Sequence, residues 1–310
     1  MSEAKPLNKP WLVAVWPGMG NVAISAGYYL MAKLGMHLLA ELSAPELFDV
    51  GHIEVKAGLI HPGHAPRNRF FAWNDPDGRH DVIVFIGEAQ PPLGKYAFCR
   101  RIIDFARELG VERVFTFAAM ATAMHPSHES RVFGAATDEE SLAELRRLEL
   151  EILDDGHIGG LNGVLLGVAA EHGFRGACVL GEMPHVFSQL PFPKASHAVL
   201  RAFATLAGIE VDLSELADQA KDMDNKLGEL LDQMQEAFGR EQTEEEPQAP
   251  LQEPTEEQRV GPEDRARIER LFERAQLDRA AAYELKRELD GHGVYREYED
   301  RFLDLFKKPE

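Results

Sequence analysis

The sequence has few cysteines, no long apolar run and no excess of basic residues, and each absence excludes a class of protein. Two cysteines in 310 residues cannot form the disulfide framework of a small secreted domain. We therefore expect Cys99 and Cys178 to be buried thiols in a cytoplasmic protein. No apolar run reaches the roughly 20 residues that a transmembrane helix needs. The segment Met1-Ser2-Glu3-Ala4-Lys5-Pro6 also lacks the pattern of a signal peptide.

The charge of the chain is strongly negative and unevenly distributed. Lys and Arg number 33 against 52 Asp and Glu, which gives a formal net charge of -19. Residues 1–210 hold 18 basic against 24 acidic side chains, and residues 211–310 hold 15 against 28. An acidic surface repels phosphate backbones and anionic lipids. We therefore expect neither a nucleic acid nor a membrane as a partner.

From Trp11 onward, short apolar runs alternate with helical patterns, as in βαβ units. Uninterrupted apolar runs are typical of parallel strands that helices cover on both faces. The pattern predicts an α/β fold, a three-layer αβα sandwich with a mostly parallel sheet, to which residues 53–60 and 69–73 add antiparallel strands or hairpins. The clearest predicted strands are 11–16, 81–86, 113–118 and 177–181, and the predicted helices are 22–34, 96–109, 139–147, 162–172 and 195–207.

Composition divides the chain into three parts. Residues 1–239 are expected to form the sandwich domain, which ends in a long amphipathic helix at 212–238. Residues 240–262 are rich in Glu, Gln and Pro and almost free of apolar side chains, so they predict a flexible acidic linker. Residues 263–310 show two further helical patterns, which predict a short helical hairpin as a C-terminal helical tail.

A glycine-rich turn, Pro17-Gly18-Met19-Gly20-Asn21, follows the first predicted strand and precedes a helix. Free N–H groups at a helix start, placed at the carboxyl edge of a sheet, can bind an anion or a small ligand. The turn is not a dinucleotide-binding G-x-G-x-x-G, because Ala23 holds the last position, and the lysine of a phosphate-binding loop is missing. A tight structural turn and a ligand loop both remain open for these residues.

A second distinctive string, His157-Ile158-Gly159-Gly160-Leu161-Asn162-Gly163, also leads into an apolar helix. Gly159, Gly160 and Asn162 are candidate ligand contacts, because glycines allow unusual backbone conformations and an Asn at a helix start can bind or cap. In the structural alternative, Gly163 and Gly167 let this helix lie close to a neighbour.

Polar residues follow the predicted strands, where the carboxyl ends of an open α/β sheet converge on the usual ligand crevice. Glu88 and Glu182 could form an acid/base pair if their surroundings separated their pKa values. Alternatively, both glutamates cap loops or face solvent. The polar residues at the strand ends are Glu88, Gln90, Thr122, His125, Glu182 and His185.

Two histidine pairs, His61 with His64 and His125 with His128, lie in predicted loops. A zinc site needs three or four converging ligands, and neither pair has a Cys or Glu at the usual spacing. The chain also lacks the G-x-S-x-G signature of a serine nucleophile. We therefore predict no catalytic residue, no metal and no cofactor.

Three segments carry a resemblance to a known family: Trp16-Pro17-Gly18-Met19-Gly20-Asn21-Val22-Ala23, the 157–163 string, and Leu180-Gly181-Glu182-Met183-Pro184 followed by Pro191-Phe192-Pro193-Lys194-Ala195. In this order they resemble the proteasome assembly chaperone 2 family of archaea and bacteria, over about residues 10–238. The resemblance implies an αβα fold similar to nucleoside phosphorylases and a homo-oligomer, a trimer or larger. It implies no established catalysis, and some relatives escort proteasome subunits.

The resemblance has two departures. Relatives that engage the proteasome can end in a hydrophobic-Tyr-any tripeptide, whereas this sequence ends Lys308-Pro309-Glu310 and its Val294-Tyr295-Arg296 is internal. A proteasome-docking tail is therefore not expected from the sequence. The segment from residue 240 onward lies outside the recognised part.

The leading hypothesis is a non-enzymatic homo-oligomeric assembly chaperone or scaffold, whose acidic tail recruits or shields proteasome subunits or another client. The alternative is a small-molecule-binding protein or a hydrolase- or ligase-type enzyme, with its site at the carboxyl edge of the sheet. A third reading makes the sandwich a plain oligomerisation platform and places all function in the tail. The candidate residues for a ligand site or an interface are Gly18, Met19, Gly20, Asn21, Glu88, Gly159, Gly160, Asn162 and Glu182.

Overall fold

The structure is a computed structural model that describes residues 6–48, 53–61, 63, 65–243 and 262–277, and ten single positions (284, 285, 288, 289, 292, 294, 298, 301, 302 and 305). These residues belong to two compact units, Met1–Glu236 and Ala237–Glu310, which are considered separately. Within the described residues, no helix has the length and apolar character needed to cross a bilayer.

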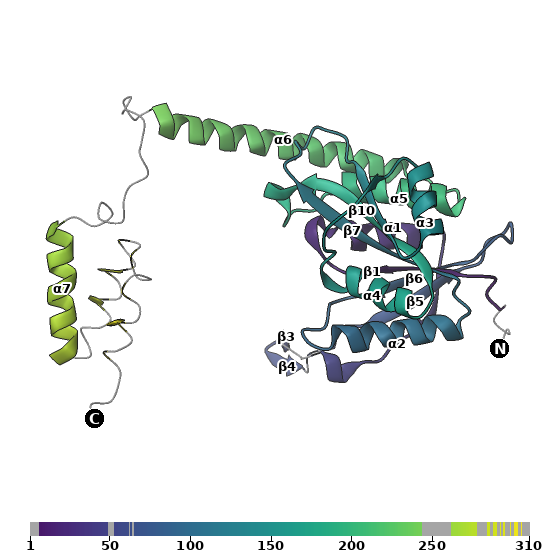
Figure 1. The fold of residues 1–310 in the computed structure, drawn as a ribbon, viewed down its shortest axis with the longest axis horizontal. Coiled ribbons are helices and arrows are strands. Elements are labelled where there is room, and N and C mark those ends of the chain that lie inside the picture. The colour runs from purple at the N-terminus through teal and green to yellow at the C-terminus, as the bar shows by residue number, and fades with distance from the viewer. Residues whose placement is uncertain are drawn as a thin grey trace. The chain divides into compact units, whose positions relative to one another are not determined.

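Among the residues that the structure describes, the first unit is built on an eight-stranded mixed sheet with the strand order β2-β5-β6-β1-β7-β10-β8-β9 (Figure 1). Its four central strands, β6, β1, β7 and β10, are parallel. β5 joins β6 and β2 joins β5 in antiparallel pairs, while β8 runs antiparallel to β10. The strands are β1 (Trp11–Val15), β2 (His37–Glu41), β5 (Asn68–Trp73), β6 (Val82–Gly87), β7 (Arg113–Thr122), β8 (Val132–Ala136), β9 (Glu151–Ile152) and β10 (Arg175–Pro184).

Helices cover both faces of this sheet, because alternate residues of each strand carry apolar side chains to opposite faces. Val13 and Val15 of β1 lie in the core beneath α1 and α5, whereas Leu12 and Ala14 lie in the core beneath α2 and α4. The predicted three-layer αβα sandwich is therefore confirmed (Figure 1). The helices are α1 (Val22–Lys33), α2 (Lys95–Glu108), α3 (Glu139–Arg147), α4 (Gly160–Glu171) and α5 (Pro193–Ala207).

The two longest strands, β7 and β10, pair over ten residues, from Arg113 opposite Arg175 to Thr122 opposite Pro184. The predicted strand ends at residues 118 and 181 were therefore too early. The missed ends, 119–122 and 182–184, contain Ala, Glu and Pro, which are depleted in strands, and they are held by pairing across the sheet. The extra length carries both strands to the carboxyl edge where the candidate site lies.

The structure corrects the prediction for several peripheral strands. β2, β8 and β9 were not predicted, and residues 53–60 were expected to join or extend the main sheet. Instead, β3 (Glu54–Lys56) and β4 (Leu59–His61) form a separate two-stranded sheet. Of the two expected antiparallel additions, only β5 belongs to the large sheet.

The long helix α6 (Ser214–Thr243) begins against the sandwich. Leu216 and Leu227 are each 2% exposed and lie in the same core as α1 and α5. The Nζ atom of Lys194 in α5 lies 2.6 Å from the Oδ2 atom of Asp224 in α6, so an ion pair also joins the two helices.

In the second unit, α7 (Pro262–Leu277) carries a small apolar cluster. Ile268 and Phe272 are fully buried against side chains such as Leu285, Leu289 and Val294. Of the linker expected at 240–262, residues 240–243 belong to α6 and residue 262 to α7, so these ends are helical rather than linker. Residues 244–261 lie outside the described residues, and so does most of the second arm of the expected helical hairpin.

Candidate functional site

A cleft of about 430 Å³ opens at the carboxyl edge of the main sheet. Its floor is the small-residue end of β7, Ala118-Ala119-Met120-Ala121, and its walls come from the two glycine-rich loops. Alanine and glycine leave this space open because they have no bulky side chains to fill it. The lining residues include Gly18, Met19, Gln90, His157, Gly159, Gly160 and Asn162.

The first glycine loop divides into a structural half and an open half. Gly20 and Asn21 adopt left-handed backbone angles, with φ of 57° and 50°, and turn the chain from β1 into α1. A Cβ atom on Gly20 would lie 2.7 Å from the sulfur of Met183, so this position is also closed to larger residues. Gly18 has no described atom within 4 Å of such a Cβ, and it lines the cleft together with Met19.

The second glycine loop has a similar division of roles. Gly160 has a φ of 69°, and Gly159 occupies the N-cap of α4. A Cβ atom on Gly163 would lie only 1.9 Å from the carbonyl oxygen of Ile158, so Gly163 permits a close approach within its own segment. Gly167 has open space around it in the described part of the chain, so only the first of these two helix glycines is needed for packing.

Gln90 connects the two loops. Its Oε1 atom accepts a hydrogen bond from the amide of Leu161 at 3.2 Å, and its Nε2 atom donates one to the carbonyl of Pro17 at 3.4 Å. A side chain from the loop after β6 thus binds the start of α4 and the loop after β1. The sequence placed Gln90 among the polar residues at strand ends but gave no sign of this bridging role.

Asn162 lies in the first turn of α4 and lines the cleft. Its backbone carbonyl accepts a hydrogen bond from the hydroxyl of Thr116 at 3.2 Å. Its side-chain Oδ1 atom is buried and has no hydrogen-bond partner among the residues that the structure describes. With Gln90 and the exposed His157, Asn162 makes the cleft polar, while the described lining residues include no acidic or lysine/arginine side chain.

Glu182, in contrast, is a buried member of an ion pair and does not line this cleft. It is 2% exposed, and Arg131 donates to it from Nε at 2.7 Å and from Nη2 at 2.6 Å. Thr122 adds a hydroxyl donor at 2.7 Å. The hydrogen bonds from Arg131 hold the pKa of Glu182 below its ordinary value, although burial acts in the opposite direction.

Glu88 lies outside the cleft as well and binds a different arginine. Its Oε1 atom accepts a hydrogen bond from Nη2 of Arg69 at 2.6 Å, and its Oε2 atom accepts one from the amide of Arg67 at 2.9 Å. The structure therefore places the two glutamates in separate ion pairs. It brings Gly18, Met19, Gly159, Gly160 and Asn162 together at the cleft, whereas Gly20 and Asn21 form the adjoining turn.

The two histidine pairs form no recognisable ligand set in the described part of the chain. The rings of His125 and His128 lie 5.7 Å apart, and Nδ1 of His125 is 2.7 Å from the hydroxyl of Ser127. His64 lies outside the described residues. No cluster of three or more potential metal ligands occurs among the residues with a described position.

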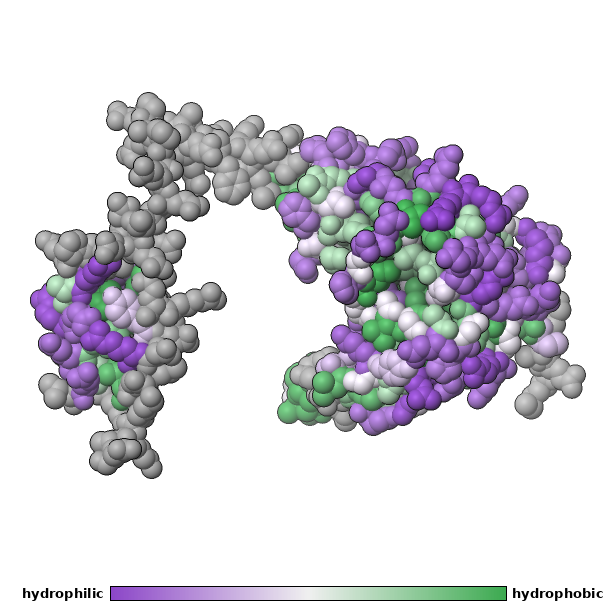
Figure 2. All heavy atoms as spheres, viewed as in Figure 1, coloured by the Kyte–Doolittle hydropathy of each residue, from purple (hydrophilic) through white to green (hydrophobic). Residues whose placement is uncertain are grey.

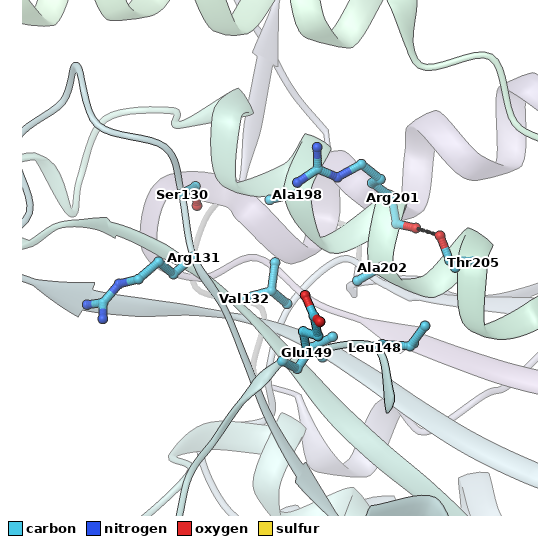
Figure 3. A pocket seen from close by; sticks show the side chains of 10 residues that line it. Ser130, Arg131, Val132, Leu148, Glu149, Ala198, Arg201, Ala202 and Thr205 are labelled. Atoms are coloured by element: carbon cyan, nitrogen blue, oxygen red, sulfur yellow. Dashed lines mark hydrogen bonds between the residues drawn. The ribbon is translucent and has the colours of Figure 1, made fainter. Parts of the chain in front are cut away.

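A second pocket, of about 350 Å³, lies between β8 and α5 (Figure 3). The carboxylate of Glu149 points into it, whereas the side chain of Arg131 extends away (Figure 3). Thr205 uses its hydroxyl to bind the carbonyl of Arg201 at 2.8 Å. This pocket includes none of the candidate residues from the sequence.

The two-stranded sheet exposes an unusual number of aliphatic side chains. Ile53, Val55, Leu59 and Ile60 are 51%, 64%, 67% and 73% exposed. In the space-filling view, hydrophobic side chains gather on this projecting segment (Figure 2). The sequence predicted these residues as antiparallel strands or hairpins added to the main sheet and gave no indication of an exposed aliphatic surface. The signal in the sequence was two aliphatic residues on each side of the turn at Ala57-Gly58.

Comparisons with known proteins agree with this fold. The sequence model described as the PAC2 family matches residues 12–231. The uncharacterized protein MJ1210 of Methanocaldococcus jannaschii is 29% identical over 241 residues, which cover 74% of this chain and 86% of the relative.

Two solved structures from Pyrococcus furiosus are similar over most of the first unit's length. PbaB, described as an archaeal proteasome activator, is 26% identical with a TM-score of 0.63 and covers 74% of this chain and 96% of its own. PbaA, described as an archaeal homolog of proteasome-assembly chaperone, is 25% identical with a TM-score of 0.57. The match covers 76% of this chain and 98% of PbaA. The family match ends before α7 begins.

Proposed function

The chain belongs to the PAC2 family, and from this membership we propose that it is a non-enzymatic assembly chaperone that works as a homo-oligomer. The observation that carries the proposal is the similarity to PbaB and PbaA, which extends over almost the whole length of both proteins. The proposed clients are proteasome subunits, in line with the descriptions of these two relatives. A cytoplasmic location belongs to the same proposal, since both cysteines are buried free thiols.

The surroundings of the two candidate carboxylates support a non-enzymatic role. An acid/base pair needs one carboxyl group whose pKa is raised and another that stays ionised, both facing one substrate. Glu182 instead has a lowered pKa in its ion pair with Arg131, and Glu88 is bound to Arg69. Two arginine-bound carboxylates that both lie outside the cleft are better suited to hold loops in place.

The exposed aliphatic residues of β3 and β4 support a role in protein association. Large contiguous apolar patches on a soluble protein commonly mark interaction sites. This surface includes Val55 and Ile60, which are directly paired across the two strands and are both largely exposed. It provides an exposed apolar contact area on an otherwise acidic chain.

The test is co-expression of the chain with the α-type proteasome subunits of the organism that encodes it. Native mass spectrometry would compare the full chain with a version truncated after Phe238. The proposal expects a complex of defined stoichiometry, and retention of that complex after truncation would assign binding to the sandwich. Loss with the truncation would assign it to the tail. Absence of any complex with the full chain would contradict the proposed clients.

The cleft supports a second candidate function, the binding of a small molecule at the carboxyl edge. The specific observation is the Oδ1 atom of Asn162, a buried acceptor with no partner in the described part of the chain. Such an atom calls for an N–H or O–H donor. A thermal-shift screen with nucleosides and small carboxylic acids would test this, with Asn162→Ala as the comparison. Equal melting temperatures with and without every compound would contradict it.

A further inference from the structure

The hairpin formed by residues 53–61, here called the β3–β4 hairpin, has a well-defined turn and no further strand beside it in the described structure. Ala57 and Gly58 have φ of 51° and 80°, so both turn residues are left-handed, as a two-residue hairpin turn of the primed type requires. A two-stranded hairpin is only marginally stable alone in water. Its four exposed aliphatic side chains add to this, because apolar surface in contact with water disfavours a hairpin without a partner.

The open edges of this hairpin contrast with those of the main sheet. At one edge of the main sheet, β2 is interrupted by a register shift between Leu38 and Ala40, and at the other edge β9 is only two residues long. Bulges and very short edge strands oppose edge-to-edge pairing. β3 and β4 are also short, with three residues each. Their ladder has no register shift, however, and their exposed side chains include Val55, Leu59 and Ile60, so a strand added at this hairpin would also cover apolar surface.

The register of the hairpin shows which backbone groups face outward. Lys56 pairs with Leu59 next to the turn, and Val55 pairs with Ile60 one step further along. In an antiparallel ladder, pairs that exchange hydrogen bonds alternate with pairs whose N–H and C=O groups point away from each other. Since the pair that closes a two-residue turn is hydrogen-bonded, Val55 and Ile60 direct their amide and carbonyl groups to the outer edges.

We propose that β3 pairs in antiparallel register with β3 of a second copy of this chain, centred on Val55. The proposal rests on the homo-oligomer proposed above and identifies its contact. Pairing about Val55 sets position 54 of each copy opposite position 56 of the other. The sequence at these positions is Glu54 and Lys56, so two opposite charges meet twice across the interface.

Charge complementarity favours this edge and this partner. With a net charge of -19, two copies repel each other in general, and close contact is favoured where the local charges cancel. β3 carries one charge of each sign in mirror-related positions. Pairing through β4 about Ile60 would instead set Leu59 opposite His61 and would bring no such complement. Side-chain alternation also places Ile53, Val55 and Ile60 on one face, so the paired hairpins would join two aliphatic faces into one.

The experiment is a charge exchange measured by sedimentation velocity on the full chain. Glu54→Lys sets lysine opposite lysine and Lys56→Glu sets glutamate opposite glutamate, so each single variant should raise the dissociation constant about tenfold. The double variant restores opposite charges in reversed positions and should return the constant to within about threefold of the original. Val55→Pro, which removes the central N–H, should abolish the association.

Two controls make the outcome decisive. Glu54→Lys lowers the net negative charge of the chain, and Lys56→Glu raises it. A general charge effect would therefore change the dissociation constants of the two variants in opposite directions. The proposed pairing instead raises the dissociation constant of both variants. Val186→Asp changes another exposed aliphatic residue, 53% exposed and outside the hairpin, and should have little effect. The melting temperature of each variant separates loss of association from loss of fold.

The outcomes also separate this inference from the proposed function. Unchanged constants in the single variants, or a double variant that is not restored, would overturn pairing through β3. If the variants still bound proteasome subunits, the chaperone proposal would stand. A chain that is monomeric at micromolar concentration would overturn both this pairing and the homo-oligomer. Monomeric variants that fail to bind the subunits would instead link the two proposals.

Discussion

Arg131 and Glu182 form a two-pronged ion pair, in which Nε binds Oε2 at 2.7 Å and Nη2 binds Oε1 at 2.6 Å. Arg131 directly precedes β8 and Glu182 lies in β10, so the pair ties two neighbouring antiparallel strands together. Arg131 also reaches Glu151 at 2.9 Å, in the edge strand β9. One arginine therefore connects three successive strands at this side of the sheet.

Replacing Arg131 with Met should destabilise the first unit by about 2–3 kcal/mol, because it leaves a buried carboxylate without its charge partner. The expected loss is at the low end for such pairs, since the arginine side chain itself is 53% exposed. Chemical denaturation at pH 7 would measure it. Glu151→Gln is the matched control, because this partner is exposed and the change should cost less than about 1 kcal/mol. Equal losses in the two variants would contradict the assignment.

The same pair predicts a dependence on pH. The pKa of Glu182 is lowered in the folded chain, so its contribution to stability is present above the ordinary glutamate pKa of about 4.3 and is lost as the pH falls through the folded value. In Arg131→Met the buried carboxyl group can take up a proton more easily. The difference in unfolding free energy between this variant and the original chain should therefore be largest at neutral pH and shrink in acid.

Two glycines of the same loop should respond very differently to an added methyl group. Gly20→Ala forces a left-handed backbone angle on alanine and sets its Cβ against the buried Met183, so we expect a loss of about 1–3 kcal/mol. Gly18→Ala meets no described atom within 4 Å and has extended backbone angles, so its melting temperature should stay within a few degrees. Similar melting temperatures for both variants would contradict the division of the loop into a structural and an open half.

Asp75 provides a second acid-sensitive contact, in the turn between β5 and β6. Burial raises its pKa, but hydrogen bonds from the side chain and amide of Arg79 and from the amide of Asp77 outweigh this effect and lower it to about 2. The resulting stabilisation, about 2 kcal/mol, should be complete above the ordinary aspartate pKa of about 4 and disappear as the pH falls from about 4 to 2. Asp75→Asn should lose most of it at pH 7, whereas Asp77→Asn, an exposed neighbour, should lose little. An unchanged acid transition in Asp75→Asn would refute this account.

Both thiols should be inert in the folded chain. Cys99 and Cys178 are fully buried, and burial raises the pKa of each thiol to about 12, so almost none is present as the reactive thiolate at pH 8. An aromatic disulfide reagent should therefore release no colour from the native protein over minutes and two equivalents after unfolding in guanidinium. Rapid release of one equivalent from the native protein would show that one of the two sites opens.

The sequence was sufficient for the elements that carry their own pattern. The strand at 11–15 and the helix at 139–147 were predicted almost residue for residue, because one is a continuous apolar run and the other is amphipathic with an N-cap at Asp138. β8, in contrast, reads Val-Phe-Gly-Ala-Ala and has little strand propensity of its own. It exists because β10, about 40 residues further along, supplies its hydrogen-bond partners.

The candidate site was predictable to the same extent. The sequence placed the first glycine loop at the carboxyl edge and named the second as a separate candidate, and the structure places Gly18, Gly159, Gly160 and Asn162 at one cleft. The interactions of Glu182 were not predictable, because its arginine partner lies 51 residues away in the chain and next to an unrecognised strand. Such a contact depends on the order of strands in the sheet, which local periodicity does not contain.

The ten-residue pairing of β7 with β10 has a consequence for how the molecule opens. Amide hydrogens along fully paired central strands exchange with solvent only in rare, nearly global unfolding events, whereas those of edge hairpins exchange through small local openings. The floor of the cleft is the end of β7, which pairs with β10 as far as Thr122 but extends past the end of β1 on its other side. We therefore expect the floor to exchange more slowly than the β3–β4 hairpin, although faster than the part of β7 that is paired on both sides. Deuterium uptake would therefore distinguish a surface that can adapt to a partner from a cleft that keeps its shape.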